Sequence, residues 1–171
     1  MIKQANIEFT KLGDTAFDNP MGEATGAAAI FGTTGGVMEA ALRTAQDVLT
    51  GEDLEKIDFK QVRGEEGIKR ATVNIAGNDL NVVAASGLSN ARQILEEIKN
   101  GTANYQFVEI MACPGGCIMG GGQPIKSSKI RREVDVRKLR ADALYTIDER
   151  STIRKSHENP ILKKIYKDYL G

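Results

Sequence analysis

The sequence predicts an α/β fold in which a small twisted, mainly parallel sheet is flanked by helices, within a single domain over residues 1–171. Alternating apolar and polar residues predict strands at 71–75 and 80–84, and an apolar run predicts another at 105–111. Segments with helical periodicity separate these strands and follow them. Alternating strands and helices favour a sheet with helices packed on it, and this length suffices to bury a core.

The first predicted helix covers residues 37–49, directly after a glycine-rich turn at 32–36, and Gly51 ends it. Glu39 and Arg43 lie four residues apart, a spacing typical of a charge pair on the exposed side of a helix. The apolar side is expected to face the core and consists of Val37, Ala40, Ala41, Ala45, Val48 and Leu49.

The remaining elements follow from turn and capping signals. Strands 71–75 and 80–84 are predicted to form a hairpin around the turn at 76–79. Ser86 or Ser89 is expected to cap a helix over residues 90–99, which Gly101 closes. Two further helices are predicted, one over residues 134–149 and one from Pro160 to the end of the sequence.

Composition and charge exclude several classes of partner. The formal net charge is zero, which argues against nucleic acid or an anionic membrane as the main partner. A basic stretch at 126–140 is expected to be the solvated face of a helix. The sequence has no apolar run long enough to span a membrane, and residues 1–6 resemble neither a signal nor a transit peptide, so a cytoplasmic protein is expected.

The motif that carries chemistry is the run Met-Ala-Cys-Pro-Gly-Gly-Cys-Ile-Met-Gly-Gly-Gly-Gln-Pro at residues 111–124. It contains both cysteines of the sequence, Cys113 and Cys117, and it follows the predicted strand 105–111. In open α/β sheets, ligands bind where loops leave the ends of strands. Thiolates surrounded by free backbone N–H groups suit an iron–sulfur cluster, because iron binds the thiolates and the N–H groups donate hydrogen bonds to cluster sulfur.

Other uses of the two cysteines are less favoured. A redox dithiol usually has two residues between its cysteines, whereas Cys113 and Cys117 have three. A zinc site needs two more Cys or His ligands, and only His157 is available, which is expected to be a capping or surface residue. A four-iron cluster normally needs four thiolates, so either another polypeptide or the rest of a larger protein would complete it.

Two further features have a functional and a structural interpretation. The loop at 31–36 precedes a helix and could cradle a phosphate, but it lacks the lysine of a P-loop, and a turn that permits close backbone approach is favoured. The carboxylates Glu23, Glu39 and Glu109 could relay protons, although surface or capping roles are favoured for each.

Several segments together resemble one family. The cysteine motif at 111–124 is similar to the third cluster-binding signature of the iron-only (FeFe) hydrogenases. Further segments resemble the C-terminal lobe of that family's catalytic domain: Phe17-Asp-Asn-Pro-Met-Gly-Glu-Ala-Thr-Gly26, the stretch 29–43, Ser86-Gly-Leu-Ser-Asn-Ala-Arg92 and Arg154-Lys-Ser-His-Glu-Asn-Pro160. The eukaryotic hydrogenase-like proteins of iron–sulfur assembly and nuclear lamin binding share a similar loop, but the Gly-Gly-Gln-Pro ending is closer to the true hydrogenases.

The resemblance implies a set of site residues around the H-cluster, a four-iron cubane joined by one thiolate to a two-iron unit that carries CO, cyanide and a dithiolate. Cys113 would ligate the cubane only, and Cys117 would ligate it and bridge to the two-iron unit. Met111 would place its thioether against the two-iron unit. The pocket over the dithiolate would be lined by Phe31 and Gly32. Independently of the family, glycine at Gly115, Gly116 and Gly120 lets backbone approach a bulky cluster.

The implied function is that of an FeFe-hydrogenase subunit or fragment, which takes part in reversible reduction of protons to hydrogen with ferredoxin as the electron carrier. It would supply two of the four cysteine ligands, and its partner would be the hydrogenase polypeptide that carries the other two cysteine signatures. The isolated chain is expected to be inactive. The alternative is a non-catalytic hydrogenase-like module. Such a module would either bind another protein or hold a plain iron–sulfur cluster between two copies of the chain.

Overall fold

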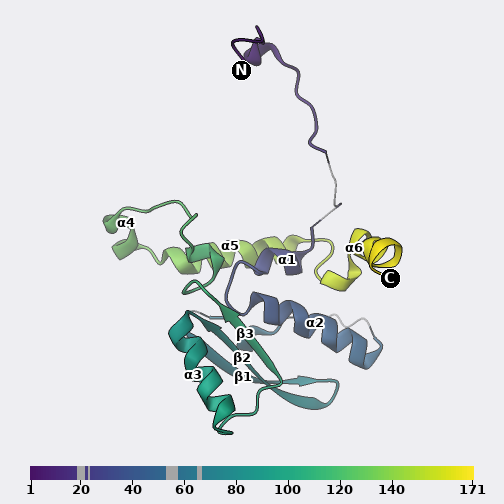
Figure 1. Cartoon of the computed structure of the whole chain (residues 1–171), viewed down its shortest axis with the longest axis vertical. Coiled ribbons are helices and arrows are strands. Elements are labelled where there is room, and N and C mark those ends of the chain that lie inside the picture. The colour runs from purple at the N-terminus through teal and green to yellow at the C-terminus, as the bar shows by residue number, and fades with distance from the viewer. Residues whose placement is uncertain (19–21, 23, 53–57, 65–66) are drawn as a thin grey trace.

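The computed structural model describes residues 1–18, 22, 24–52, 58–64 and 67–171, and within them a three-stranded sheet lies between helices (Figure 1). The strands β1 (Ile68–Ile75), β2 (Asn78–Ser86) and β3 (Phe107–Met111) are adjacent in that order. The predicted α/β class is confirmed. The sheet itself is mixed, since β1 pairs antiparallel with β2 and β2 pairs parallel with β3. The expectation of a mainly parallel sheet is corrected because the predicted hairpin forms part of the sheet.

The hairpin is confirmed, with strands longer than predicted and a shorter turn. Ile75 pairs with Asn78, so only Ala76 and Gly77 connect the strands. Both have positive φ, 51° and 81°, as the two-residue turns that match the twist of a hairpin require.

The core lies on both faces of β2. The segment from Val82 to Ala85 is fully buried, which is typical of a strand covered on each side. Val82 and Ala84 pack toward helix α2 (Gly36–Thr50), while Val83 and Ala85 pack toward helix α3 (Leu88–Lys99). The two faces of the sheet are therefore occupied by α2 and α3, as Figure 1 shows.

Helix α2 is confirmed in position, but its predicted orientation is wrong. Gly51, with φ of 69°, ends it as expected. Glu39 and Arg43 are fully buried, whereas Val48 and Leu49 are 71% and 60% exposed. The helix buries its charged side because other segments bring opposite charges to meet it, and part of its apolar side stays on the surface.

The start of α3 also differs from the prediction. The helix begins at Leu88, after Gly87, and neither Ser86 nor Ser89 is its capping residue. Ser86 is the last residue of β2, and its hydroxyl accepts a hydrogen bond from the Gly115 N–H at 3.1 Å. Beyond the helix, Gly101 has φ of 67° and closes it as predicted.

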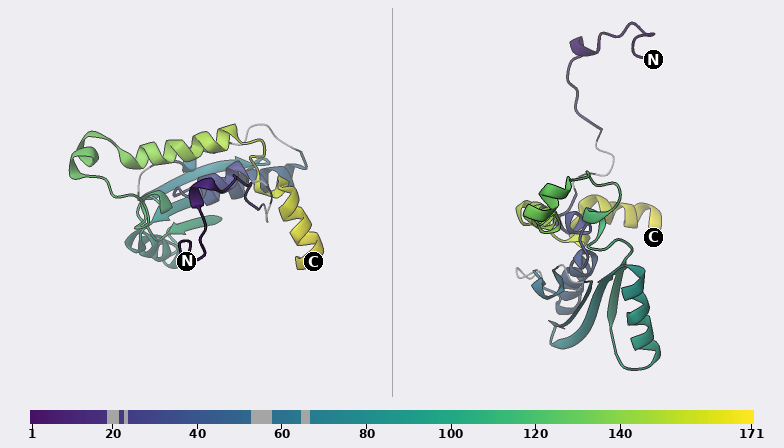
Figure 2. Two further views of the ribbon diagram at one scale, coloured as in Figure 1. Left: turned by 90° about the horizontal axis from the view of Figure 1, so that it is seen from above. Right: turned by 90° about the vertical axis from the view of Figure 1, so that its left-hand side faces the viewer.

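An outer layer of helices covers α2 on the side away from the sheet (Figure 2). Helix α1 (Gly26–Ile30) contacts both α2 and α5 (Val136–Arg150), and α5 confirms the helix predicted at 134–149. A short helix α4 (Ser128–Glu133) precedes it. Pro160 begins α6 (Pro160–Ile165), which continues into a π-helical turn over Tyr166–Leu170. Short 3-10 turns complete the structure at Phe9–Lys11, Lys60–Val62, Cys117–Met119 and Ser156–Glu158.

A buried charge cluster joins α2 to α5. Both Arg43 and Asp148 are fully buried, and the Arg43 guanidinium donates to the two carboxylate oxygens of Asp148, each at 2.8 Å. Arg43 also donates to Glu39 at 2.8 Å, and Arg154 donates to Asp148 at 2.6 Å and to Asp58 at 2.9 Å. Breaking a buried, hydrogen-bonded ion pair leaves an uncompensated charge, so the cluster ties residues 134–171 firmly to α2.

We expect this cluster to make the free energy of unfolding fall in acid. Burial alone would raise the pKa of Asp148, but hydrogen bonds from Arg43 and Arg154 outweigh it and hold that pKa below the ordinary value of 3.8. The pKa of Asp58 is lowered from 3.8 as well, because Arg154 and Arg63 outweigh its burial. As pH falls below 3.8, the unfolded chain takes up protons first, so stability is lost. Urea denaturation between pH 7 and 3 should show this fall, and a flat profile below pH 4 would contradict it.

Candidate metal centre

The cysteine loop leaves the end of β3 as the sequence predicted. Met111 is the last residue of the strand, and its carbonyl accepts from the Gly87 N–H at 2.8 Å. Cys113 is half-buried, whereas Cys117 is exposed and begins the 3-10 turn Cys117–Met119. Neither forms a disulfide, so both thiols are available as ligands.

Two consecutive glycines shape the loop between the cysteines. Gly115 and Gly116 have φ of 83° and 93°, in the left-handed region that favours glycine. The Gly116 N–H donates to the Cys113 carbonyl at 2.9 Å, which closes the turn. A Cβ on Gly116 would lie 2.7 Å from the Gly32 carbonyl oxygen, so the backbones of two loops meet here without space for a side chain.

The glycine-rich loop at 32–36 lies directly against the cysteine loop. The Ile118 N–H donates to the Gly32 carbonyl at 3.1 Å. A Cβ on Gly32 would lie 2.7 Å from Leu144 of α5, so this position is crowded from two sides. This is the close backbone approach favoured for the loop, and it places Gly32 beside the cysteines. Phe31 ends α1 next to Gly32 and is 42% exposed.

Glu109 caps helix α2 and removes support for phosphate binding there. Its buried carboxylate accepts from the backbone N–H groups of Gly35 and Met38 at 2.6 and 2.7 Å. A phosphate at this helix N-terminus would have to displace that carboxylate. Capping is therefore the role that the structure gives Glu109. Glu39 is an ion-paired residue of the buried charge cluster, and Glu23 lies outside the described residues.

Three residues that lie against the cysteine loop have no signal in the sequence. Ser86 accepts from Gly115, as described above. Arg140 of α5 donates to the carbonyls of Ile118 and Pro124 at 2.7 and 3.0 Å. Arg137 of α5 lies beside Gly115, with its Nε 3.0 Å from where a Cβ on Gly115 would be. These residues lie at least 16 positions from their partners, beyond the reach of local patterns.

The basic stretch forms one wall of a cavity beside this loop. The cavity measures about 650 Å³ and lies between residues 119–126 and the segment 131–140. Five cationic side chains and two carboxylates line it: Lys126, Arg131, Arg132, Arg137, Arg140, Glu133 and Asp135. The stretch therefore gathers positive charge next to the cysteine loop, in addition to forming a solvated helix face.

An apolar surface spans α1, α2 and α6. Two open cavities of about 490 and 390 Å³ share Phe31 and Ser156. One runs along the outward side of α2 past Val48, and the other lies between α1 and α6. We call these two cavities together the apolar surface. Its main large exposed side chains are Phe31, Val48 and Leu162.

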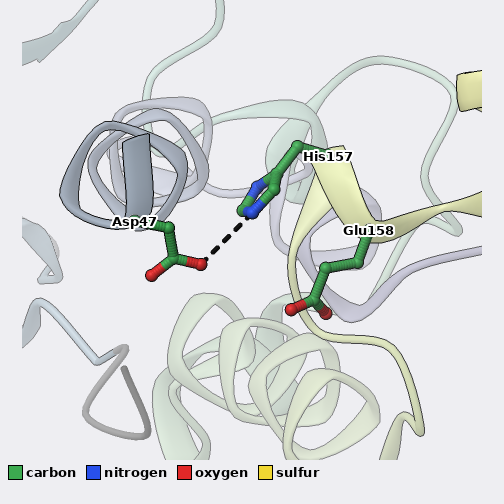
Figure 3. A group of neighbouring side chains, drawn as sticks. All are labelled: Asp47, His157 and Glu158. Carbon is green, nitrogen blue, oxygen red and sulfur yellow. Dashed lines mark ion pairs between the residues drawn. The ribbon is translucent and has the colours of Figure 1, made fainter. Parts of the chain in front are cut away.

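His157 lies in a group of ionisable side chains far from the cysteines in sequence (Figure 3). Its Nε2 is 3.2 Å from an Asp47 carboxylate oxygen, and its Nδ1 is 3.0 Å from the Thr44 hydroxyl. Asp47, His157 and Glu158 could in principle hold a metal ion. However, the Lys155 ammonium is 2.7 Å from Asp47 and 3.8 Å from Glu158, so we assign the group to ion pairing between α2 and the turn Ser156–Glu158. His157 is thus half-buried and bonded, neither a cap nor a free surface residue.

The donor set at the cysteine loop fits part of an iron–sulfur site. Gly120 lies beside Cys113, whose Sγ is 3.8 Å from where a Cβ on Gly120 would be. Within the described ranges, neither cysteine belongs to a group of three or more clustered Cys, His, Asp or Glu ligands, so these residues form no complete zinc site. Two thiolates fit two of the ligand positions of a four-iron cluster.

Comparison with known proteins identifies the family. The family model described as iron only hydrogenase large subunit, C-terminal domain, matches residues 1–121. The chain belongs to the iron-only hydrogenase family. A second model of the family, described as iron hydrogenase small subunit, matches residues 134–171, which contain α5 and α6.

Hydrogenases are also among the most similar individual proteins. Iron hydrogenase 1 of Clostridium pasteurianum is 50% identical over the whole chain, which spans 30% of that protein. The periplasmic hydrogenase large subunit of Nitratidesulfovibrio vulgaris is 54% identical over 73% of the chain and 30% of the relative. A solved FeFe-hydrogenase of Chlamydomonas reinhardtii matches with a TM-score of 0.63 and 38% identity, over 99% of this chain and 48% of that one. The chain thus spans about a third of these curated relatives and about half of the solved enzyme.

Proposed function

We propose that this chain is the C-terminal lobe of an FeFe-hydrogenase catalytic domain and supplies two of the four cysteine ligands of the H-cluster. The observation that carries the proposal is the loop that follows β3, which holds the two free thiols of Cys113 and Cys117. The chain that carries this loop belongs to the iron-only hydrogenase family. When bound, the H-cluster would supply the iron site for reversible reduction of protons to hydrogen. The role of this chain is to bind and orient the cluster and to exclude water around it.

The roles proposed for the individual residues are those that the resemblance to the FeFe-hydrogenases implies. Cys113, half-buried at the strand end, would ligate the cubane only, and the exposed Cys117 would ligate it and bridge to the two-iron unit. Met111 would present its thioether to the two-iron unit. Phe31 and Gly32, beside the loop, would line the pocket over the dithiolate. The left-handed turn of Gly115 and Gly116 would keep the two thiols directed to one cluster.

The partner proposed for this chain is the hydrogenase polypeptide that carries the other two cysteine signatures. The apolar surface supports this, because patches of this kind mark protein interfaces and the chain spans only part of its relatives. The surface lies next to Gly32, so a polypeptide seated on it would also reach the cysteine loop.

We expect the isolated chain to show no hydrogenase activity, because half of the cluster ligands lie outside it. A tagged copy should be purified without oxygen from its native host and its companions identified by mass spectrometry. A companion with the two other cysteine signatures, and hydrogen production by the complex alone, are the expected results. Hydrogen production by the purified chain alone would contradict the expectation.

Ferredoxin is the electron carrier that we propose. The support is the basic cavity beside the cysteine loop, since excess positive charge steers an acidic redox protein to the point where electrons enter. In the assembled enzyme, Arg131→Glu with Arg132→Glu should raise the KM for reduced ferredoxin by about tenfold or more, an effect that falls with salt. Lys163→Glu with Lys164→Glu on α6 is the matched control, and equal KM values for the two variants would contradict the carrier site.

A cytoplasmic location is also proposed, although one relative is named as periplasmic. Its support is that both cysteines are free thiols in the structure. In the part of the chain that is described, no helix is long and apolar enough to cross a membrane. Fractionation of the native host would decide between cytoplasm and periplasm.

The second candidate is a non-catalytic module, in which two copies of the chain hold a plain cluster through four thiolates. Its support is a more distant relative, a probable cytosolic iron–sulfur cluster assembly factor of Dictyostelium discoideum, which is 33% identical over 83% of the chain. The higher identity to hydrogenases favours the first proposal.

A further inference from the structure

Arg140 bridges two ends of the glycine-rich part of the cysteine loop. Its Nη1 donates to the Ile118 carbonyl at 2.7 Å, and its Nη2 donates to the Pro124 carbonyl at 3.0 Å. One planar guanidinium thus holds two carbonyls on either side of the run Met119–Gln123. A lysine has a single flexible ammonium and cannot reproduce this fork.

The residue that Arg140 holds is adjacent to Cys117. Ile118 is buried, its N–H donates to the Gly32 carbonyl, and its C=O accepts from Arg140. Both polar groups of this residue are therefore fixed, one by the loop before α2 and the other by α5. The backbone of Cys117 is directly bonded to Ile118, so both elements fix the place from which its side chain starts.

Among the described residues, few contacts besides those of Arg140 hold the part of the loop that follows Cys117. Residues 121–127 are exposed, and glycines make the backbone there costly to order. Within it, the Gly120 N–H donates to the Cys117 carbonyl at 3.0 Å and the Gln123 N–H donates to the Gly120 carbonyl at 3.1 Å. Without Arg140, these two turns would keep local contacts but lose their attachment to α5.

Arg140 also brings a permanent positive charge to the loop. Its Nη1 lies 3.8 Å from the Met119 sulfur, and Arg137 flanks the loop at Gly115. A guanidinium stays protonated at any working pH. A fixed cation beside thiolate-ligated iron favours the more reduced, more negative state of the cluster.

We propose that Arg140 is a positioning residue for Cys117, through which the segment that matches the small-subunit model acts on the cluster. Arg140 belongs to α5, inside residues 134–171, while both cysteines belong to the part that matches the large-subunit model. The expected effect of Arg140 on the cluster rests on the proposed function. The expected effect of Arg140 on the loop does not, because it depends only on contacts within this chain.

The test compares Arg140→Lys and Arg140→Gln in the full chain within the assembled enzyme. Hydrogen exchange of the hydrogen-bonded amides at 118–120 and at Gln123, measured before cluster loading, should become about tenfold faster or more in both variants, because two charge-assisted hydrogen bonds that hold this run to α5 are lost or weakened. After loading, a redox titration followed by electron paramagnetic resonance should give a lower cubane potential for Arg140→Gln. Arg140→Lys keeps the charge, so its potential should shift less.

Arg131→Gln is the matched control, since it removes a cation lining the same cavity. It should leave both the exchange rates and the potential unchanged. Unchanged exchange in both Arg140 variants, or the same changes in Arg131→Gln, would overturn the positioning role. Failure of the unsubstituted enzyme to load a cluster would count against the proposed function instead, while the exchange data would still decide the role of Arg140.

Discussion

Replacing Cys117 by alanine in the assembled enzyme is expected to abolish hydrogen production and uptake. Cys117 is exposed at the start of a 3-10 turn whose next residue is fixed from two sides, so its backbone occupies a defined position. In the proposed role it both ligates the cubane and bridges to the two-iron unit, and the only other cysteine in this sequence is Cys113. Activity with an artificial electron donor measures the loss without involving the carrier site.

The matched comparison is Met111→Leu, at the end of the strand that leads into the loop. Leucine is similar in volume but lacks the soft sulfur, so we expect the cubane to be retained while turnover changes. Iron content and electron paramagnetic resonance report the cubane, and hydrogen production reports turnover. Unchanged turnover in both Cys117→Ala and Met111→Leu would mean that the motif has been assigned wrongly.

The second large effect is expected from Asp148→Asn, which should lower the free energy of unfolding by about 3–5 kcal/mol. Asp148 is fully buried and accepts both hydrogen bonds of the Arg43 guanidinium. Without its charge, Arg43 keeps Glu39 but loses its bidentate partner, and Arg154 loses a partner as well. Urea denaturation of the complex at pH 7 measures the difference.

Asp142→Asn is the control for this prediction, because Asp142 lies on the same helix in an exposed pair with Lys138 at 3.0 Å. An exposed pair of this spacing contributes about 0.5 kcal/mol or less. A similar loss of stability in Asp142→Asn and Asp148→Asn would show that the buried cluster is not what holds α5 in place.

The fold could be predicted where local patterns decide it. The hairpin, the strand before the cysteines, and the helices ended by Gly51 and begun by Pro160 follow from alternation and turn residues. The orientation of α2 could not be predicted, because periodicity assumes that a chain buries its own apolar side. Here Arg43 pairs with Asp148, 105 residues away, and Glu39 pairs with Arg63, 24 residues away.

The candidate site also has a part that the sequence predicts and a part that it does not. The cysteine motif was evident, since its residue types and spacing carry the chemistry. Its supports were not, because Ser86 and Arg140 bind it from 29 and 22 residues away through ordinary hydrogen bonds. Ser86 was even expected to cap a helix, a role that its local sequence favours equally well.

The infrared spectrum of the complex purified without oxygen tests the central claim most directly. If this chain supplies Cys113 and Cys117 to an H-cluster, the complex must show bands from CO and cyanide, and Cys117→Ala must remove them. A complex that contains iron and sulfide but shows no such bands would contradict the claim and leave the chain as a holder of a plain cluster.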